Sequence, residues 1–197
     1  MTGQWSIEGR RDDRLWLELH KDRPEAWFSA HLPLTQFQGL TEELLVSSAR
    51  VSFQLVREAG TFTFSGSFHD RAGTGEWTFN AAPALLALLR RHGYELPTNE
   101  QLFSLAVSDV NAAYIDGLRS AGYDAISLNG IIALKSNGVT VPYVESLGDA
   151  GYRRLTASQL IALRTNRVDG EFIKRVEKRG RKNLTVGRLL SLRTNGC

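Results

Sequence analysis

The residues best suited to nucleophilic chemistry lie close together in the N-terminal half of the chain. Ser65, Ser67, His69 and Asp70 supply the residue types of a serine hydrolase, in which a histidine accepts the hydroxyl proton and a carboxylate orients the histidine. This segment alternates apolar and polar residues, as a strand does, and it lacks the G-x-S-x-G turn that holds a nucleophilic serine. Both serines therefore fall on one strand face, and we predict no catalytic residues.

The residues that could bind a metal do not form a ligand set. The four histidines are His20, His31, His69 and His92, and no two of them have the four-residue spacing of a helical metal pair. Only His20 and His31 are spaced to approach each other across neighbouring strands, whereas a catalytic metal needs three or four converging ligands. The single cysteine, Cys197, excludes an internal disulfide and any zinc site with two thiolates. We expect neither a metal nor another cofactor.

The C-terminal segment 169–197 is strongly basic. It contains eight Lys and Arg residues against three acidic ones, although the net charge of the whole chain is only +3. We take six of them as candidate binding residues: Lys174, Arg175, Lys178, Arg179, Arg181 and Lys182. Such a segment is either a solvated end of a repeat array or a surface for an acidic protein or for nucleic-acid phosphates. No aromatic residue is interleaved with the basic run, so stacking on single-stranded nucleic acid is not supported.

The composition is that of a folded globular protein. Of 197 residues, 42% are apolar and 23% are charged, which excludes wholesale disorder. No apolar run approaches the roughly 18–20 residues that cross a bilayer, and the N-terminal segment is too polar for a secretory signal. We therefore expect no membrane span and a cytoplasmic location for the chain as it stands, or an extracytoplasmic one if the chain is a fragment of a membrane sensor.

An internal repeat organises the C-terminal part of the chain. Its clearest marker is a glycine at four equivalent and evenly spaced positions: Gly93, Gly122, Gly151 and Gly180. The repeat divides this part into four units without insertion or deletion: 82–110, 111–139, 140–168 and 169–197. Sequence units of equal length that follow one another without gaps are typical of proteins built from stacked structural repeats.

Each repeat unit predicts two short helices. Residues that can cap a first helical turn begin the first helix of units two to four: Asn111, Thr140 and Asp169. The repeated glycine follows, where a helix commonly ends in a left-handed residue. A second set of capping residues begins the second helix: Thr98, Ser127, Thr156 and Thr185. Gln101 and Gln159 complete capping boxes in units one and three.

The N-terminal segment 1–81 has a different period. Leu15, Leu17 and Leu19 alternate with other residues, as do Phe62 and Phe64, and period two is typical of half-buried strands. Turn residues separate six or seven such segments, near 3–8, 14–20, 26–32, 35–38, 48–57, 60–68 and 74–80.

Together these patterns predict an α+β protein of two domains. Residues 1–81 form an antiparallel β domain, either a small sandwich or one curved sheet, because the connections between strands are short. Residues 82–197 form a four-unit helical hairpin repeat, in which pairs too short to bury their apolar faces alone stack into an α-solenoid. The period changes between Asn80 and Pro83 without a flexible linker, so we expect the two parts to pack directly.

Two sequence features carry a family resemblance. They are the segment RVSFQLVREAGTFTFSGSFHDRAGTGEWTF and repeats of the form F/Y-I-x-x-L-x-x-x-G-Y-x-x-L-T-x-x-Q-L-I-A-L-R, which together span about residues 5–197. In these features the chain resembles the extracytoplasmic C-terminal region of bacterial membrane zinc metallopeptidases of the beta-lactam-sensor type, and of related regulators. The resemblance implies a sensing or protein-contacting module. The HExxH motif of the peptidase is absent, so its catalysis is not carried over.

We therefore expect a non-catalytic regulatory module of bacterial origin that binds a protein or peptide. Solenoids present extended surfaces for such contacts. Two alternatives stay open. One is a small ester or lactone hydrolase with its site at the cleft between the domains, and the other is nucleic-acid binding through the basic last repeat unit.

Overall fold

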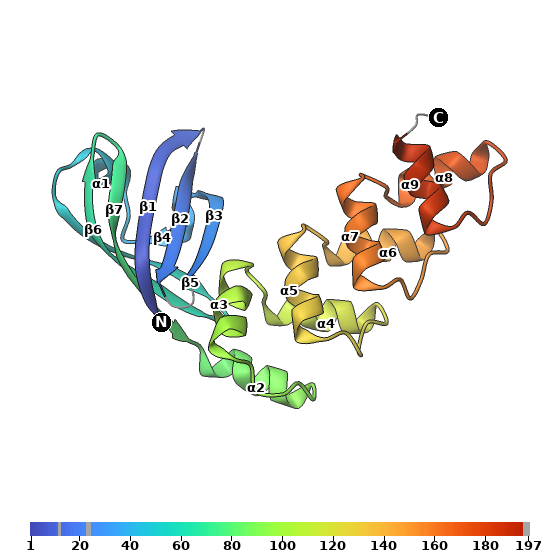
Figure 1. Ribbon diagram of the computed structural model, residues 1–197, viewed down its shortest axis with the longest axis horizontal. Coiled ribbons are helices and arrows are strands. Elements are labelled where there is room, and N and C mark those ends of the chain that lie inside the picture. Colours follow the sequence, from blue (N-terminus) through green and yellow to red (C-terminus); the bar gives the residue numbers. More distant parts are fainter. Residues whose placement is uncertain (12, 23–24, 195–197) are drawn as a thin grey trace. The chain divides into compact units, whose positions relative to one another are not determined.

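The computed structural model describes residues 1–11, 13–22 and 25–194. It is an α+β protein in which an antiparallel sheet is followed along the chain by helices (Figure 1). Two compact units are present: the sheet unit, Met1–Asp109, and the helical unit, Val110–Cys197. Each unit has a hydrophobic core of its own. The single cysteine, Cys197, lies outside the described residues.

The described strands of the sheet unit form one curled antiparallel sheet (Figure 1). Their bounds are β1 Thr2–Arg11, β2 Arg14–Asp22, β3 Glu25–Pro33, β4 Phe37–Gln38, β5 Arg50–Arg57, β6 Gly60–His69 and β7 Ala72–Ala81. The spatial order β3-β2-β1-β7-β6-β5-β4 consists of two meanders joined where β1 pairs with β7. The strands predicted from period two are confirmed, and the sheet is one curled layer rather than a sandwich.

Alternate side chains point to a buried inner face and an exposed outer face of this sheet. The inner face carries the apolar residues of the period-two pattern, and Leu17, Phe53, Phe64 and Trp77 are each at most 1% exposed. Rings on neighbouring strands pack together: Phe53 stacks on Phe64 with 4.7 Å between ring centroids. Burial of these side chains is the main favourable contribution to the stability of the sheet unit.

Two glycines make room on the inner face for the indole of Trp5. Gly66 of β6 pairs with Gly75 of β7. A Cβ atom on Gly66 would lie 2.8 Å from the Trp5 ring, and one on Gly75 would lie 2.0 Å from the carbonyl oxygen of Ser65. The Trp5 indole N–H donates a hydrogen bond to that carbonyl at 3.1 Å. Both positions therefore exclude any side chain larger than hydrogen.

Three α-helices belong to the described part of the sheet unit. They are α1 Glu42–Val46, α2 Pro83–Arg91 and α3 Asn99–Val107, and a short 3-10 helix, η1 Leu34–Gln36, precedes β4. Helix α1 contacts β6, and α3 contacts both β6 and β7. Thr98 begins α3 with the predicted capping box, in which its hydroxyl accepts the backbone N–H of Gln101 and the Gln101 side chain accepts the N–H of Thr98.

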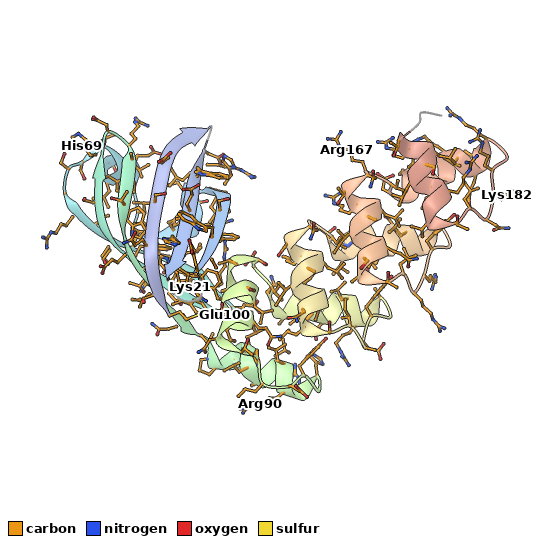
Figure 2. The ribbon with its side chains drawn as sticks, viewed as in Figure 1. Lys21, His69, Arg90, Glu100, Arg167 and Lys182 are labelled. Atoms are coloured by element: carbon orange, nitrogen blue, oxygen red, sulfur yellow. The ribbon has the colours of Figure 1, made fainter. Side chains whose placement is uncertain are left out.

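Helix α3 contributes an aromatic ring and an acid to the core of the sheet unit. The ring of Phe103 stacks on Trp77 at 5.5 Å and meets Phe62 edge-on at 5.8 Å between ring centroids. Lys21 of β2, which is 2% exposed, forms an ion pair with Glu100 on α3 (Figure 2). A buried ammonium group requires such a partner, because desolvation strongly disfavours an unpaired charge. Both interactions hold α3 against the sheet.

The compact sheet unit therefore extends past the last strand to Asp109. The change of sequence period between Asn80 and Pro83 marks the end of β7 and the start of α2. The first helical pair, α2 and α3, lies in the same compact unit because α3 packs on the sheet. An ion pair between Arg57 Nε of β5 and Asp109 Oδ1, at 3.5 Å, ties the end of this pair to the sheet.

The described part of the helical unit consists of nine-residue helices in two rows. Their bounds are α4 Ala112–Ser120, α5 Leu128–Ser136, α6 Val141–Asp149, α7 Ala157–Thr165, α8 Gly170–Lys178 and α9 Val186–Thr194. Helix α6 contacts α4 and α8, whereas α7 contacts α5 and α9 (Figure 1).

Local chemistry explains where these helices begin and end. Each predicted capping side chain accepts a backbone N–H from the residue three positions later: Asn111, Ser127, Thr140, Thr156, Asp169 and Thr185. The repeated glycine takes positive φ values of 80–90° at all four positions. These are left-handed conformations that glycine adopts at low cost, so each glycine ends the first helix of its pair.

Tyrosine hydroxyls connect the helices at equivalent positions. Tyr114 donates to the carbonyl oxygen of Val139 at 2.7 Å, and Tyr143 donates to that of Val168 at 2.6 Å. A second set links neighbouring pairs. The hydroxyl of Tyr123 accepts the N–H of Leu155 at 3.2 Å, and Tyr152 donates to the carbonyl of Leu184 at 2.7 Å.

Candidate functional site

The six basic residues singled out in the sequence lie together on the last helical pair. Lys174, Arg175 and Lys178 belong to α8, and Arg179 follows as its C-terminal cap. Arg181 and Lys182 lie in the loop that leads to α9 (Figure 2). We name this set the basic surface, and all six residues are exposed.

Helix α8 fixes the direction of the basic surface. The Asp169 carboxylate begins the helix by accepting the N–H of Phe172 at 2.7 Å. Phe172, Ile173 and Val176 are buried on one helix face. Because a helix places residues 174, 175 and 178 outside this face, their cationic groups point to solvent.

Three of the cationic side chains on the basic surface also have favourable interactions within the helix itself. Lys174 Nζ lies 3.6 Å from Glu171 Oε1, a contact between exposed groups that contributes little to stability. Lys178 and Arg179 stand at the C-terminal end of α8, where positive charge interacts favourably with the unpaired helix carbonyls. Arg181 and Lys182 lie beyond the helix, in the loop before α9. The basic surface can accept carboxylate or phosphate groups.

The candidate hydrolase residues do not form a catalytic arrangement. Ser65 and Ser67 lie on the outer face of β6, as the alternation predicts. His69 Nε2 lies 3.4 Å from Asp70 Oδ2, but the two side chains are 83% and 93% exposed. A histidine and a carboxylate that are both in water lack the desolvated, oriented contact that activates a nucleophile.

His20 and His31, whose spacing allows an approach across neighbouring strands, do not lie opposite each other. In the register of β2 with β3, His20 lies opposite Trp27, whereas His31 lies opposite Trp16. His20 stacks on Trp27 with 4.1 Å between ring centroids, and His31 packs on Trp16 at 4.5 Å. Each histidine therefore contacts a different indole. Among the described residues, no group of three or more His, Cys, Asp or Glu side chains is placed to hold a metal ion.

The repeat tyrosines are structural groups. Burial raises the pKa of both Tyr114 and Tyr143 above the usual value, because the charged phenolate would lose its hydration. Each hydroxyl donates its proton to a backbone carbonyl, so the neutral form is the one that bonds. A cation lies over each ring: Lys135 at 4.7 Å from Tyr114 and Arg164 at 5.4 Å from Tyr143.

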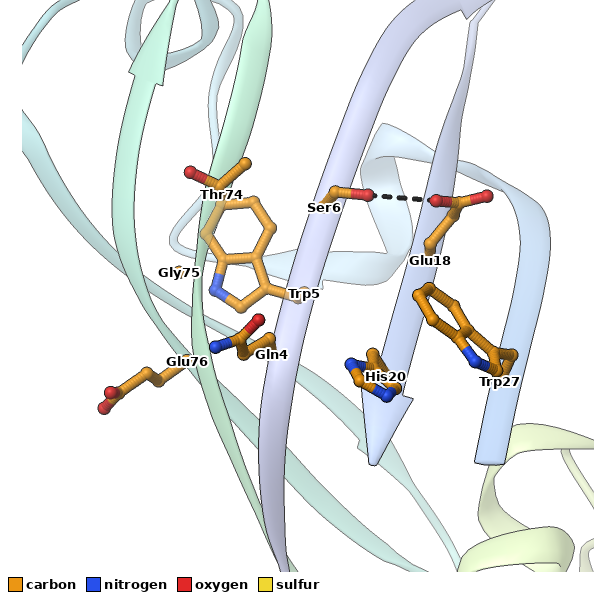
Figure 3. Close-up of a pocket in the computed structure, with 9 residues that line it drawn as sticks. All are labelled: Gln4, Trp5, Ser6, Glu18, His20, Trp27, Thr74, Gly75 and Glu76. Atoms are coloured by element: carbon orange, nitrogen blue, oxygen red, sulfur yellow. Dashed lines mark hydrogen bonds between the residues drawn. The ribbon is translucent and has the colours of Figure 1, made fainter. Parts of the chain in front are cut away.

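A pocket on the outer face of the sheet was not predicted from the sequence. Its volume is about 460 Å³, and strands β1, β2, β3 and β7 form its floor (Figure 3). We name it the outer-face pocket. It is lined by Gln4, Trp5, Ser6, Glu18, His20, Trp27, Thr74, Gly75 and Glu76.

The outer-face pocket combines residues that are far apart in the sequence. Gln4 lies opposite Glu76 across the β1–β7 pair, 72 positions away. Gln4 also lies opposite His20, which in turn lies opposite Trp27. The one local signal was Trp27 itself, a large aromatic residue in the polar register of a predicted strand.

Comparison with known proteins gives no relative from which a role could be transferred. No protein family, curated protein or solved structure matches the chain. No helix within the described ranges has the length and apolar character required to cross a bilayer. The basic surface and the outer-face pocket are the two features of the described residues that could bind a partner or ligand.

Proposed function

We propose that the chain is a non-catalytic binding module whose helical unit binds an acidic peptide segment of a partner protein. The observation that carries this proposal is the basic surface, in which six exposed cationic side chains lie on one helix and the loop that follows it. A cluster of this kind attracts carboxylates over distances near the Debye length and increases the rate of association.

The distribution of charge between the two units supports an acidic partner. The helical unit carries 14 basic and seven acidic residues, whereas the sheet unit carries 10 basic and 14 acidic residues. The net charge of the whole chain is only +3 because the acidic excess of the sheet unit offsets the basic excess of the helical unit. A partner segment rich in Asp and Glu complements this unit and is repelled by the sheet unit.

The arrangement of the helices supports a peptide rather than a compact ligand. We propose that the helix pairs form an α-solenoid, because the caps, the tyrosine bonds and the cations over aromatic rings recur from one repeat unit to the next. Stacked pairs present an extended surface to a linear partner. A regulatory role of this kind is also what the resemblance to sensor-type metallopeptidase regions implies.

Nucleic acid fits the basic surface less well. Glu171 and Glu177 lie on the same helix as Lys174 and Arg175, but these carboxylates repel phosphates and peptide carboxylates alike, so they do not distinguish the two partners. Phe172, the one aromatic residue of α8, is buried, so this helix offers no ring on which a base of single-stranded nucleic acid could stack.

A matched pair of charge reversals tests the proposal. Lys178→Glu/Arg179→Glu reverses two charges at the C-terminal end of α8, whereas Arg90→Glu/Arg91→Glu reverses two exposed charges at the C-terminal end of α2. Both pairs oppose the helix dipole in the same way, so their effects on stability are similar. Binding is measured by fluorescence anisotropy with a labelled 12-residue Glu-rich peptide and with a 12-base-pair DNA duplex.

The proposal predicts different effects of the two variants on peptide binding. The α8 variant should weaken binding of the acidic peptide by about tenfold or more, while the α2 variant should change it by less than about twofold. Equal losses in both variants would show that only the total charge matters. Tighter binding of DNA than of the peptide, with a steep dependence on salt, would favour the nucleic-acid alternative.

A further inference from the structure

The outer-face pocket presents a row of polar groups that ends at an exposed aromatic ring (Figure 3). Glu76, Gln4, His20 and Trp27 lie opposite one another on four adjacent strands. Neighbouring strands are about 4.8 Å apart, so this row extends over roughly 14 Å. Its side chains stand on paired strands, which position them more rigidly than a loop would.

The indole ring of Trp27 exposes a large apolar surface to solvent. Its side chain is 68% exposed, although it stands on a regular strand. The imidazole of His20 is stacked against the indole with an interplanar angle of 12°. The ring is therefore fixed in orientation by its neighbour while much of its surface is left uncovered. A ligand that covers this surface gains the free energy of removing it from water.

The polar groups of the pocket are also oriented before any ligand binds. Glu18 accepts a hydrogen bond from the Trp16 indole N–H at 3.0 Å and one from the Ser6 hydroxyl at 3.2 Å. Each carboxylate oxygen keeps a further lone pair for a ligand hydroxyl. Gln4 adds both an amide donor and a carbonyl acceptor, so the pocket offers donors and acceptors side by side.

The negative charge of the residues that line the outer-face pocket restricts the kinds of ligand that can bind there. Glu18 and Glu76 both line the pocket, and no Lys or Arg is among its described lining residues. Two carboxylates disfavour phosphorylated, sulfated or carboxylated ligands. They favour ligands that donate hydrogen bonds, which are polyols, amides or cations.

We infer that the outer-face pocket binds an uncharged saccharide. The face of an indole carries partial negative charge and packs against the C–H groups on one side of a pyranose ring, which carry partial positive charge. The vicinal hydroxyls at the ring edge donate to Glu18 and Glu76 and exchange hydrogen bonds with Gln4. This assignment concerns the sheet unit and is independent of the acidic peptide proposed for the helical unit.

The residues that line the outer-face pocket suit a cationic ligand less well than a saccharide. Ammonium ligands are held by several rings arranged as a cage, whereas the described lining offers a single exposed indole, that of Trp27. The Trp16 ring is occupied by His31 at 4.5 Å between centroids and is not part of the described lining. The amide of Gln4 and the hydroxyls of Ser6 and Thr74 would contribute little to the binding of a cation.

The test is a titration of the full chain with three neutral trisaccharides, cellotriose, maltotriose and triacetylchitotriose, each to about 10 mM, and with choline. Binding is followed by the indole N–H signals in two-dimensional NMR, where the signal of Trp27 is assigned from its absence in Trp27→Ala. At least one trisaccharide should shift the Trp27 signal. Trp27→Ala should weaken that binding by about tenfold or more, whereas Trp27→Phe should keep part of it.

Two further variants distinguish a saccharide from a cation and from a nonspecific apolar contact. Glu76→Gln keeps an acceptor oxygen but removes the charge, so saccharide affinity should change by less than about fivefold, whereas a cation site would lose its binding. Val56→Ala removes another exposed apolar side chain, 44% exposed on β5, and should leave affinity unchanged. Far-UV circular dichroism establishes that each variant keeps its fold.

Several results would overturn the inference. No shift with any of the three trisaccharides would do so, as would equal affinity of the parent and Trp27→Ala. Choline that binds more tightly than every trisaccharide, with binding lost in Glu76→Gln, would assign the pocket to a cation instead.

Discussion

Replacing Phe103 by alanine removes the ring that α3 places on the inner face of the sheet. Phe103 is 7% exposed and packs on Trp77 and Phe62 at 5.5 and 5.8 Å between ring centroids. Truncation of a buried phenylalanine generally costs about 3–5 kcal/mol, and the aromatic pairs are part of that cost. Because the ring comes from one helix at the boundary of the core, we expect a loss of about 3 kcal/mol.

Urea unfolding followed by tryptophan fluorescence is the appropriate assay. The four tryptophans, Trp5, Trp16, Trp27 and Trp77, all belong to the sheet unit, so their emission reports on this unit separately from the helical unit. With a urea dependence of about 1–3 kcal/mol per molar, a loss of about 3 kcal/mol lowers the midpoint by about 1–3 M.

The matched control is Leu96→Ala, in the segment that leads into α3. Leu96 is 63% exposed, so its truncation should change the free energy of unfolding by less than about 0.5 kcal/mol. If the midpoint of Phe103→Ala equals that of Leu96→Ala, α3 is not part of the core of the sheet unit and the division at Asp109 is wrong. The same reasoning predicts that residues 1–81 alone, which lack α3, give an unstable or aggregating product.

Three further predictions address single interactions. Gly151→Val should destabilise the helical unit by about 1–2 kcal/mol in thermal melting, because φ is +86° there, whereas Gly187→Ala should stabilise it by about 0.5 kcal/mol. Glu100→Gln should cost the sheet unit about 1–2 kcal/mol in urea unfolding, because the buried Lys21 ammonium loses its counter-charge, and the double variant with Lys21→Met should recover most of this loss. Tyr143→Phe should cost about 1 kcal/mol at pH 7. Burial raises the pKa of Tyr143, so the folded chain keeps the proton longer than the unfolded chain. The parent then loses stability as the pH rises above about 10, and urea midpoints should show the deficit of the variant shrinking.

Each of these predictions has a contrary result. Equal melting temperatures for Gly151→Val and the parent would contradict the strain assigned to the left-handed residue. Additive effects of the Lys21 and Glu100 substitutions would show that the two side chains do not interact. A deficit for Tyr143→Phe that stays constant from pH 7 to pH 11 would show that the hydroxyl does not titrate with folding.

The helix ends and the strands could be predicted because their causes are local. Thr156 and Gln159 form a capping box because they are the N-cap and the third residue of the same helix. The positive φ of Gly151 likewise follows from the end of the helix directly before it. The alternation of apolar and polar residues likewise indicates which face of a strand is buried, and it does so without any knowledge of which strand lies beside it. The grouping of the six basic residues is local in the same sense, since they lie on one helix and on the loop after it.

The outer-face pocket and the role of α3 depend on pairing between distant segments. The sequence pattern does not determine that β1 pairs with β7, and this pairing brings Gln4 beside Glu76. The register of β2 with β3 keeps His20 and His31 apart, because each histidine lies opposite a tryptophan of the other strand. Period two does place Lys21 on the buried side of β2, but its partner Glu100 lies 79 positions away.

The tyrosine bonds between helix pairs have a mechanical consequence. Tyr123 ties the second pair to Leu155 in the third, and Tyr152 ties the third to Leu184 in the fourth. A force that pulls on the two ends of this unit loads these ties in series, so each tie carries the same force and the weakest one yields first. Each pair that detaches releases one repeat unit, which extends to about 100 Å of chain. The helical unit would thus lengthen under load in discrete steps rather than continuously.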